Sequence, residues 1–248
     1  MAGKKYLTSR DIKMINFLED TSLLIPAKQA AMLFYKSPTN NTKSSITVAQ
    51  NRLKVAHELK QIKRYRDHID QSFVYYAGKK PTKIEHKLLI TDFLMHFCDE
   101  FEVISIETEF KGLEKAYGIR PDIYITFKFG THTVSALIEC DNTKGFTNGD
   151  TYLKVMEDKR NKKLTSVLPY PLLIISCTNH KNNHEFQPIT IKTDFSDFSK
   201  IKFALLIISC TDKKNDHEFK PITIKTDFSD FSKIKFALIR AYDNKKRE

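Results

Sequence analysis

Acidic side chains stand at the ends of two apolar runs in the middle of the chain. Asp122 opens the first run, and Glu139 and Asp141 close the second. Glu139 and Asp141 are two residues apart, so a strand would place both side chains on one face. Carboxylate oxygens at neighbouring strand ends suit Mg²⁺, and Glu109 on the preceding run is a third candidate. The predicted metal ligands are therefore Glu109, Asp122 and Glu139.

Nucleases of the PD-(D/E)xK fold combine such a pair of acids with a lysine two residues after the second acid, which orients or activates water. Here that position holds Asp141, so Lys144, Lys154 or Lys159 would have to supply the amine. The predicted catalytic set is Asp122, Glu139, Asp141 and Lys154. Two interpretations stay open: an active Mg²⁺-dependent nuclease, and an inactive relic of that fold that binds a partner. We expect no cofactor, apart from Mg²⁺ in the active case.

A second group of residues suits binding to a polyanion. Residues 1–83 hold 16 Lys and Arg against 6 Asp and Glu, whereas the rest of the chain holds 25 against 24, so the net charge of +11 is almost entirely N-terminal. Neutralising DNA phosphates releases counterions, and Gln or Asn side chains can read base edges. A basic face kept for solubility is the alternative. The predicted DNA-binding residues are Ser45, Thr47, Gln50, Asn51, Arg52, Lys54, Lys63, Arg64 and Arg66.

Periodic patterns predict the elements that position these basic residues. Helical spacing of apolar residues covers 8–20, 26–34 and 44–60. Two short strand-like runs, 62–66 and 72–77, flank a polar turn and predict a hairpin. Three helices followed by a basic hairpin is the arrangement of a winged helix-turn-helix, in which the third helix enters the major groove of double-stranded DNA.

The pattern changes after Lys79-Lys80-Pro81 to an αβββαβ order. The predicted fold class is α+β, with an N-terminal winged helix-turn-helix followed by a PD-(D/E)xK-nuclease-like domain. The expected domains are 1–80, 81–204 and 205–248, the last with a basic tail. The expected elements of the second domain are helices at 86–101 and 150–164 and strands at 103–110, 122–129, 133–140 and 172–177.

The C-terminal part of the chain contains a duplicated 33-residue unit. Residues 172–204 and 205–237 align without gaps and differ at four pairs. These pairs are Asn179/Asp212, His180/Lys213, Asn183/Asp216 and Gln187/Lys220. Two near-identical units indicate a recent tandem duplication rather than a solenoid, which needs at least three units. Because only one copy can take the central place in the sheet, we expect the other to be an appendage without a role of its own.

Neither the cysteines nor the apolar runs indicate secretion or membrane insertion. Cys98, Cys140, Cys177 and Cys210 lie in apolar surroundings without close pairing, as buried thiols in a reducing compartment do. The longest aliphatic run, 203–208, is far too short to cross a bilayer, and the first residues lack the apolar stretch of a signal peptide. We expect a cytoplasmic protein with no membrane partner.

Six motifs along the chain together suggest a family. They are Leu7-Thr8-Ser9-Arg10-Asp11, Gln50-Asn51-Arg52-Leu53-Lys54, Phe73-Val74-Tyr75-Tyr76, His86, Arg120-Pro121-Asp122 and Ile138-Glu139-Cys140-Asp141. In this order, over residues 6–177, they resemble the replication-relaxation family of plasmids and mobile elements in Gram-positive bacteria.

The resemblance implies a DNA-binding accessory factor at a plasmid or mobile-element origin, acting in replication, DNA relaxation or conjugative mobilisation. It also implies a relaxase or replication initiator as partner. A winged-helix transcriptional repressor is the alternative among binding proteins, and a homodimer is left open. The C-terminal duplication is not part of the family pattern, and Asp141 replaces the expected lysine.

Overall fold

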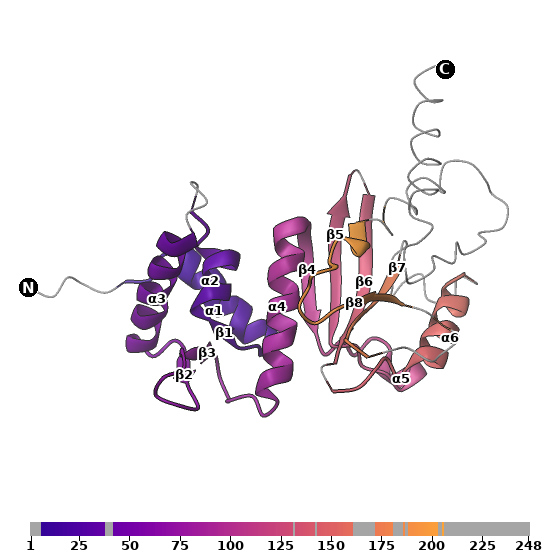
Figure 1. Cartoon of the computed structure of the whole chain (residues 1–248), viewed down its shortest axis with the longest axis horizontal. Helices are drawn as coiled ribbons and strands as arrows, with labels where there is room; N and C mark the ends of the chain where they lie inside the picture. Colours follow the sequence, from indigo (N-terminus) through magenta and orange to yellow (C-terminus); the bar gives the residue numbers. More distant parts are fainter. Residues whose placement is uncertain are drawn as a thin grey trace, which may run out of the picture. The chain divides into compact units, whose positions relative to one another are not determined.

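The structure is a computed structural model that describes residues 6–37, 42–130, 132–141, 143–160, 172–180, 186, 188–202 and 205. Its elements are mixed α+β, with two separate sheets (Figure 1). Residues 1–200 form one compact unit and residues 201–248 a second. Most of the second unit, including nearly all of the second repeat copy, lies outside the described residues, as does the predicted helix beyond residue 160.

The N-terminal part contains helices and a small antiparallel sheet with strand order β1-β3-β2. The helix α1 begins with a reciprocal cap, in which the Thr8 side chain accepts from the Asp11 backbone and the Asp11 side chain accepts from Thr8. The sequence patterns did not predict β1, which has two residues. The elements are α1 Ser9–Thr21, β1 Ile25–Pro26, α2 Ala27–Phe34, α3 Thr42–Glu58, β2 Lys63–Tyr65 and β3 Val74–Tyr76.

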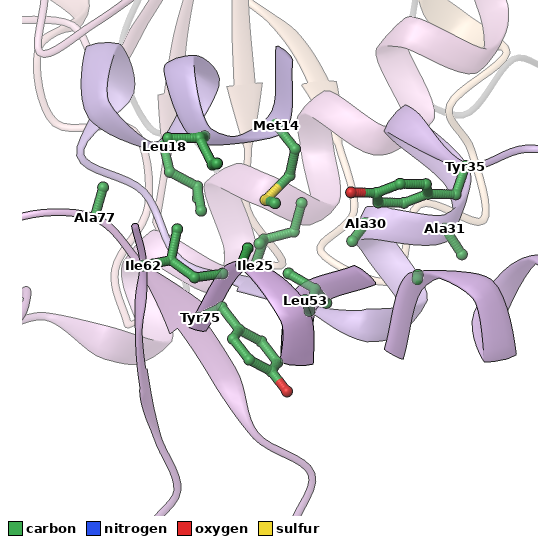
Figure 2. Packing of buried hydrophobic residues seen from close by; sticks show 13 residues of the cluster. Met14, Leu18, Ile25, Ala30, Ala31, Tyr35, Leu53, Ile62, Tyr75 and Ala77 are labelled. Carbon is green, nitrogen blue, oxygen red and sulfur yellow. The ribbon is translucent and has the colours of Figure 1, made fainter. Parts of the chain in front are cut away.

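One apolar core holds these elements together (Figure 2). Met14 and Leu18 of α1 meet Leu53 of α3, and all three side chains are fully buried. The core also contains Ile15 of α1, Ala49 and Ala56 of α3, and residues in or next to β1, α2, β2 and β3, namely Ile25, Ala30, Ala31, Tyr35, Ile62, Tyr75 and Ala77. Because α3 buries only the side that carries Ala49, Leu53 and Ala56, its opposite side remains in solvent.

The long helix α4, Ile84–Glu100, is hydrogen-bonded to the N-terminal elements within the first unit. The buried Thr91 hydroxyl donates to the Leu24 carbonyl over 2.8 Å. From β4 (Glu102–Thr108) of the second sheet, the Thr108 hydroxyl donates to the Thr21 carbonyl, also over 2.8 Å. Direct hydrogen bonds as well as the connecting segment 77–83 therefore attach the N-terminal elements to α4 and β4.

The second sheet has the strand order β4-β5-β6-β7-β8. The pairs β4–β5 and β5–β6 are antiparallel, whereas β6–β7 and β7–β8 are parallel. All six residues of β7 are buried, as the continuous apolar run predicted for a central strand. The elements are β4 Glu102–Thr108, α5 Glu114–Tyr117, β5 Ile123–Phe129, β6 His132–Cys140, α6 Gly149–Arg160, β7 Leu172–Cys177 and β8 Ile189–Ile191.

Candidate functional site

Sheet topology brings two of the predicted acidic residues together. Ile123 opens β5 and pairs with Ile138 near the end of the antiparallel β6, so Asp122 and Glu139 meet at one edge of the sheet. They line a cleft of about 700 Å³. The cleft is bounded by the β2–β3 hairpin, the start of α4, the loop after β6, and β7. Its lining includes Asp67, Thr82, Lys83, His86, Asp122, Glu139, Asp141, Thr143, Lys144, Asn148 and Ser176.

Both oxygens of Asp122 are occupied by protein groups. Its Oδ2 accepts a hydrogen bond of 2.8 Å from the Cys140 backbone N–H, and its Oδ1 lies 3.0 Å from His86 Nε2. The hydrogen bond to Asp122 raises the pKa of His86, against the opposing effect of burial. Asp122 thus fixes the start of α4 against the sheet edge, which the sequence patterns did not predict.

Glu139 is partly buried beside the Asp122 carboxylate. Burial raises the pKa of Glu139 to about 7, and the negative charge of Asp122 acts in the same direction. Two hydrogen-bond donors oppose this rise in pKa without cancelling it. Glu139 Oε1 accepts a hydrogen bond of 2.7 Å from the Tyr152 hydroxyl and one of 3.2 Å from Asn148 Nδ2. Near neutral pH the Glu139 carboxyl group therefore exchanges between its protonated and ionised forms.

Asp141 stabilises the loop that follows β6. Its Oδ1 accepts from the Thr143 N–H over 2.8 Å and from the Lys144 N–H over 3.0 Å. Burial raises the pKa of Asp141, but these bonds outweigh it and the pKa falls below its ordinary value. The neighbouring strand holds the same loop, because the Cys177 carbonyl accepts from the Asp141 N–H and the Thr178 hydroxyl donates to the Lys144 carbonyl.

Two of the predicted residues lie outside the cleft. The Glu109 carboxylate pairs with Lys87 Nζ at 2.7 Å, and Lys154 is exposed on α6. Among the described residues, no three His, Cys, Asp or Glu side chains are arranged to hold a metal ion. Both Asp122 oxygens and Glu139 Oε1 are engaged by protein groups, and Glu109 lies elsewhere, so the three predicted ligands do not form a Mg²⁺ site in this arrangement.

The predicted DNA-binding residues of α3 divide between its two sides. Thr47, Gln50, Asn51 and Lys54 are exposed along the solvent side of the helix. Ser45 points the other way: it is 4% exposed, and its hydroxyl oxygen accepts 2.9 Å from the Ser37 backbone N–H. Of the six predicted residues of α3, four are thus exposed to a partner.

Arg52 is engaged inside the N-terminal part. Its guanidinium pairs with the fully buried Asp11 and also donates 2.7 Å to the Tyr6 carbonyl. The Tyr35 hydroxyl donates 2.7 Å to the same carboxylate. Burial favours the neutral acid, but the hydrogen bonds from Arg52, Tyr35 and Thr8 outweigh it and lower the pKa of Asp11 to about 2. In this arrangement Arg52 neutralises a buried charge.

The three predicted cations of the hairpin are held in defined positions. The guanidinium carbons of Arg64 and Arg66 lie 4.1 and 4.6 Å from the centroid of the Phe73 ring. Arg66 Nη1 also donates 2.8 Å to the Ile69 carbonyl, and Lys63 Nζ donates 2.8 Å to Gly78. Cation–π contacts orient both guanidinium groups without neutralising their charge.

Comparison with known proteins does not indicate a function for this chain. No protein family, curated protein or solved structure matches the chain. Within the described parts of the chain, no helix has both the length and the apolar character needed to cross a membrane. The geometry of the cleft and of the exposed side of α3 with the hairpin is the basis for a functional proposal.

Proposed function

We propose that the protein binds double-stranded DNA through the exposed side of α3 and the β2–β3 hairpin. This surface is called the basic face and comprises Lys43, Thr47, Gln50, Asn51, Lys54, Lys63, Arg64 and Arg66. The observation that carries the proposal is that two lysines, Lys43 and Lys54, flank the amide side chains of Gln50 and Asn51 on the exposed side of one helix. The only acidic residue of that helix is Glu58, its last residue. Phosphate contacts position such a surface, and the amides read bases.

The order of the N-terminal elements supports this assignment. Their order is helix, strand, helix, helix, strand and strand, and the sheet order is β1-β3-β2, which supports the proposal of a winged helix. In that fold the third helix enters the major groove, and the hairpin, or wing, follows the backbone. Here α3 is the corresponding helix, and its Gln50 and Asn51 can form paired hydrogen bonds to adenine. The stacked Arg64 and Arg66 are the wing's phosphate contacts.

Salt dependence of binding tests this proposal. The basic face has five cations: Lys43, Lys54, Lys63, Arg64 and Arg66. If each neutralises one phosphate, the logarithm of the association constant falls against the logarithm of salt concentration with a slope of about −4.5. Fluorescence anisotropy of a labelled duplex, measured from about 50 to 200 mM salt, gives this slope. A slope near zero would contradict phosphate binding.

For the biological role, we propose an accessory factor at a plasmid or mobile-element origin, acting in replication, DNA relaxation or mobilisation. The support is the resemblance of the motifs over residues 6–177. The partner proposed for the second sheet is a relaxase or a replication initiator. Footprinting on the parent replicon distinguishes this role from transcriptional repression, because the protected segment is an origin in the first case and a promoter in the second.

DNA cleavage is the competing function for the cleft, and its geometry argues against it. Asp122 and Glu139 accept hydrogen bonds from protein donors, and Asp141 takes the place of the lysine. We therefore expect plasmid DNA to stay supercoiled when incubated with the protein and Mg²⁺ or Mn²⁺, as followed on an agarose gel. Metal-dependent nicking that Asp122→Asn abolishes would establish a nuclease instead.

A further inference from the structure

We propose that the two copies of the 33-residue repeat are interchangeable occupants of one place in the second sheet. In the structure, copy 1 (172–204) supplies β7 and β8. Under this proposal copy 2 (205–237) can supply the same two strands, and the copy that is not used remains outside the sheet. The chain then has two folded isomers that share every other element.

The buried residues of copy 1 are the first support. Its described buried positions are 172–178, 188, 191, 198 and 201. Each of them recurs unchanged 33 positions later in copy 2. Since burial and packing decide which sequence a central strand position accepts, copy 2 meets the same requirements.

The hydrogen bonds between copy 1 and the loop after β6 can also form when copy 2 takes its place. The Cys177 carbonyl accepts from Asp141, and the Thr178 hydroxyl donates to Lys144. Copy 2 has Cys210 and Thr211 at these positions. The same wall of the cleft is therefore built in both isomers.

The two substitutions that fall on described residues of copy 1 avoid the core. Asn179 and His180 are exposed, and positions 183 and 187 lie outside the described residues. Asn179 Oδ1 accepts 3.1 Å from the Thr193 N–H, and its Nδ2 donates to the Thr193 hydroxyl. In copy 2, Asp212 retains the acceptor for the backbone N–H, and the hydroxyl can reverse its role and donate to the carboxylate.

Leu205 shows which isomer the structure contains. It follows copy 1 as Leu238 follows copy 2, and it is also the counterpart of Leu172, the first residue of β7. The structure places Leu205 in helical conformation with 1% of its surface exposed. Leu205 thus acts here as the residue that follows copy 1, not as the start of a strand. In the other isomer it begins the strand, and Leu238 takes its place.

The length of the connecting segment sets the balance between the isomers. The segment from α6 to the central strand has 11 residues (161–171) when copy 1 is used and 44 residues (161–204) when copy 2 is used. By the entropy of chain closure, a connection four times as long is less favourable by a factor of roughly eight. The copy 1 isomer is therefore the major form, with a minor form of about a tenth.

Paired substitutions in the full-length chain test the exchange. Ile175 is fully buried in β7, and Ile208 is its counterpart. An aspartate at either position excludes that copy from the sheet, because an unpaired carboxylate is not accepted in a core. The readout is the protection of the buried Cys140 thiol, which lies opposite Cys177 in the sheet, from an alkylating reagent, followed by peptide mass spectrometry.

We expect I208D to leave Cys140 protection almost unchanged and I175D to lower it about ninefold, since only the minor isomer remains. In the double variant, protection of Cys140 should fall roughly a thousandfold or more. In I175D, Cys210 should become protected while Cys177 becomes reactive. If I175D loses as much protection as the double variant, the copies are not interchangeable. Rescue of I175D only in a dimeric fraction would overturn exchange within one chain.

Discussion

Replacing Lys54, Lys63, Arg64 and Arg66 together by alanine is expected to weaken binding to duplex DNA about a thousandfold, at roughly 1 kcal/mol for each lost phosphate contact. The fold should be retained, because Lys54, Lys63 and Arg64 are exposed and Arg66 is only half-buried. The salt slope should fall from about −4.5 to about −1, since Lys43 alone remains. Anisotropy titrations of one duplex at several salt concentrations measure both quantities.

A control with the same loss of charge separates the basic face from net charge. Four other exposed lysines of the first unit lie away from α3 and the hairpin: Lys111, Lys115, Lys154 and Lys192. Their combined replacement by alanine lowers the net charge equally and should weaken binding less than tenfold, because distant surface charges are screened at physiological salt. Equal losses of affinity in the two variants would mean that binding arises from overall charge, and the assignment of the basic face as the DNA-binding surface would be wrong.

The elements of the N-terminal part could be predicted because their signals are local. A reciprocal cap and apolar spacing mark α1, and a polar turn between two short runs marks the hairpin. The strand β1 has no such signal. Its two residues, Ile25 and Pro26, become a strand only by pairing with β3, and two residues are too few to show alternation. Tertiary pairing decides this element.

The candidate site shows the same division between local and long-range information. Asp122 and Glu139 could be identified because one opens and the other closes a strand-like run, and antiparallel pairing of adjacent strands brings such positions together. His86 and Tyr152 were not identified as their partners, since they reach the carboxylates from α4 and α6, across 36 and 13 residues of sequence. Helix packing against a sheet leaves no spacing rule that would show these contacts in the sequence.

Arg52 illustrates why a residue type alone does not assign a role. In the sequence it belongs to a cluster with Lys54, Lys63 and Arg64, and nothing in the sequence distinguishes the role of one cation from that of another. Its partner Asp11 lies 41 residues away, and nothing local marks that carboxylate as buried. The side of α3 on which a cation lies determines whether it meets solvent or another helix. Arg52 and Lys54 lie two positions apart, on different sides of α3.

Arg52→Ala is therefore expected to reduce stability rather than to remove a DNA contact. The substitution leaves the Asp11 carboxylate buried without its cation, which costs about 3 kcal/mol in the free energy of unfolding at pH 7. The value lies at the low end for a broken buried pair, because Tyr35 and Thr8 still donate to Asp11. Urea unfolding measures the loss. Lys54→Ala, at an exposed position of the same helix, should change stability by less than about 0.5 kcal/mol.

The pH dependence of that loss identifies its cause. The pKa of Asp11 is lowered from 3.8 to about 2 in the folded protein, so its ionised form stabilises the fold above about pH 4. This contribution disappears as the pH falls towards 2. In Arg52→Ala the main hydrogen bond is gone and burial raises the pKa of Asp11, so acidification relieves the buried charge. The stability difference between wild type and variant should therefore shrink between pH 5 and pH 2, and a constant difference would show that Arg52 acts independently of Asp11.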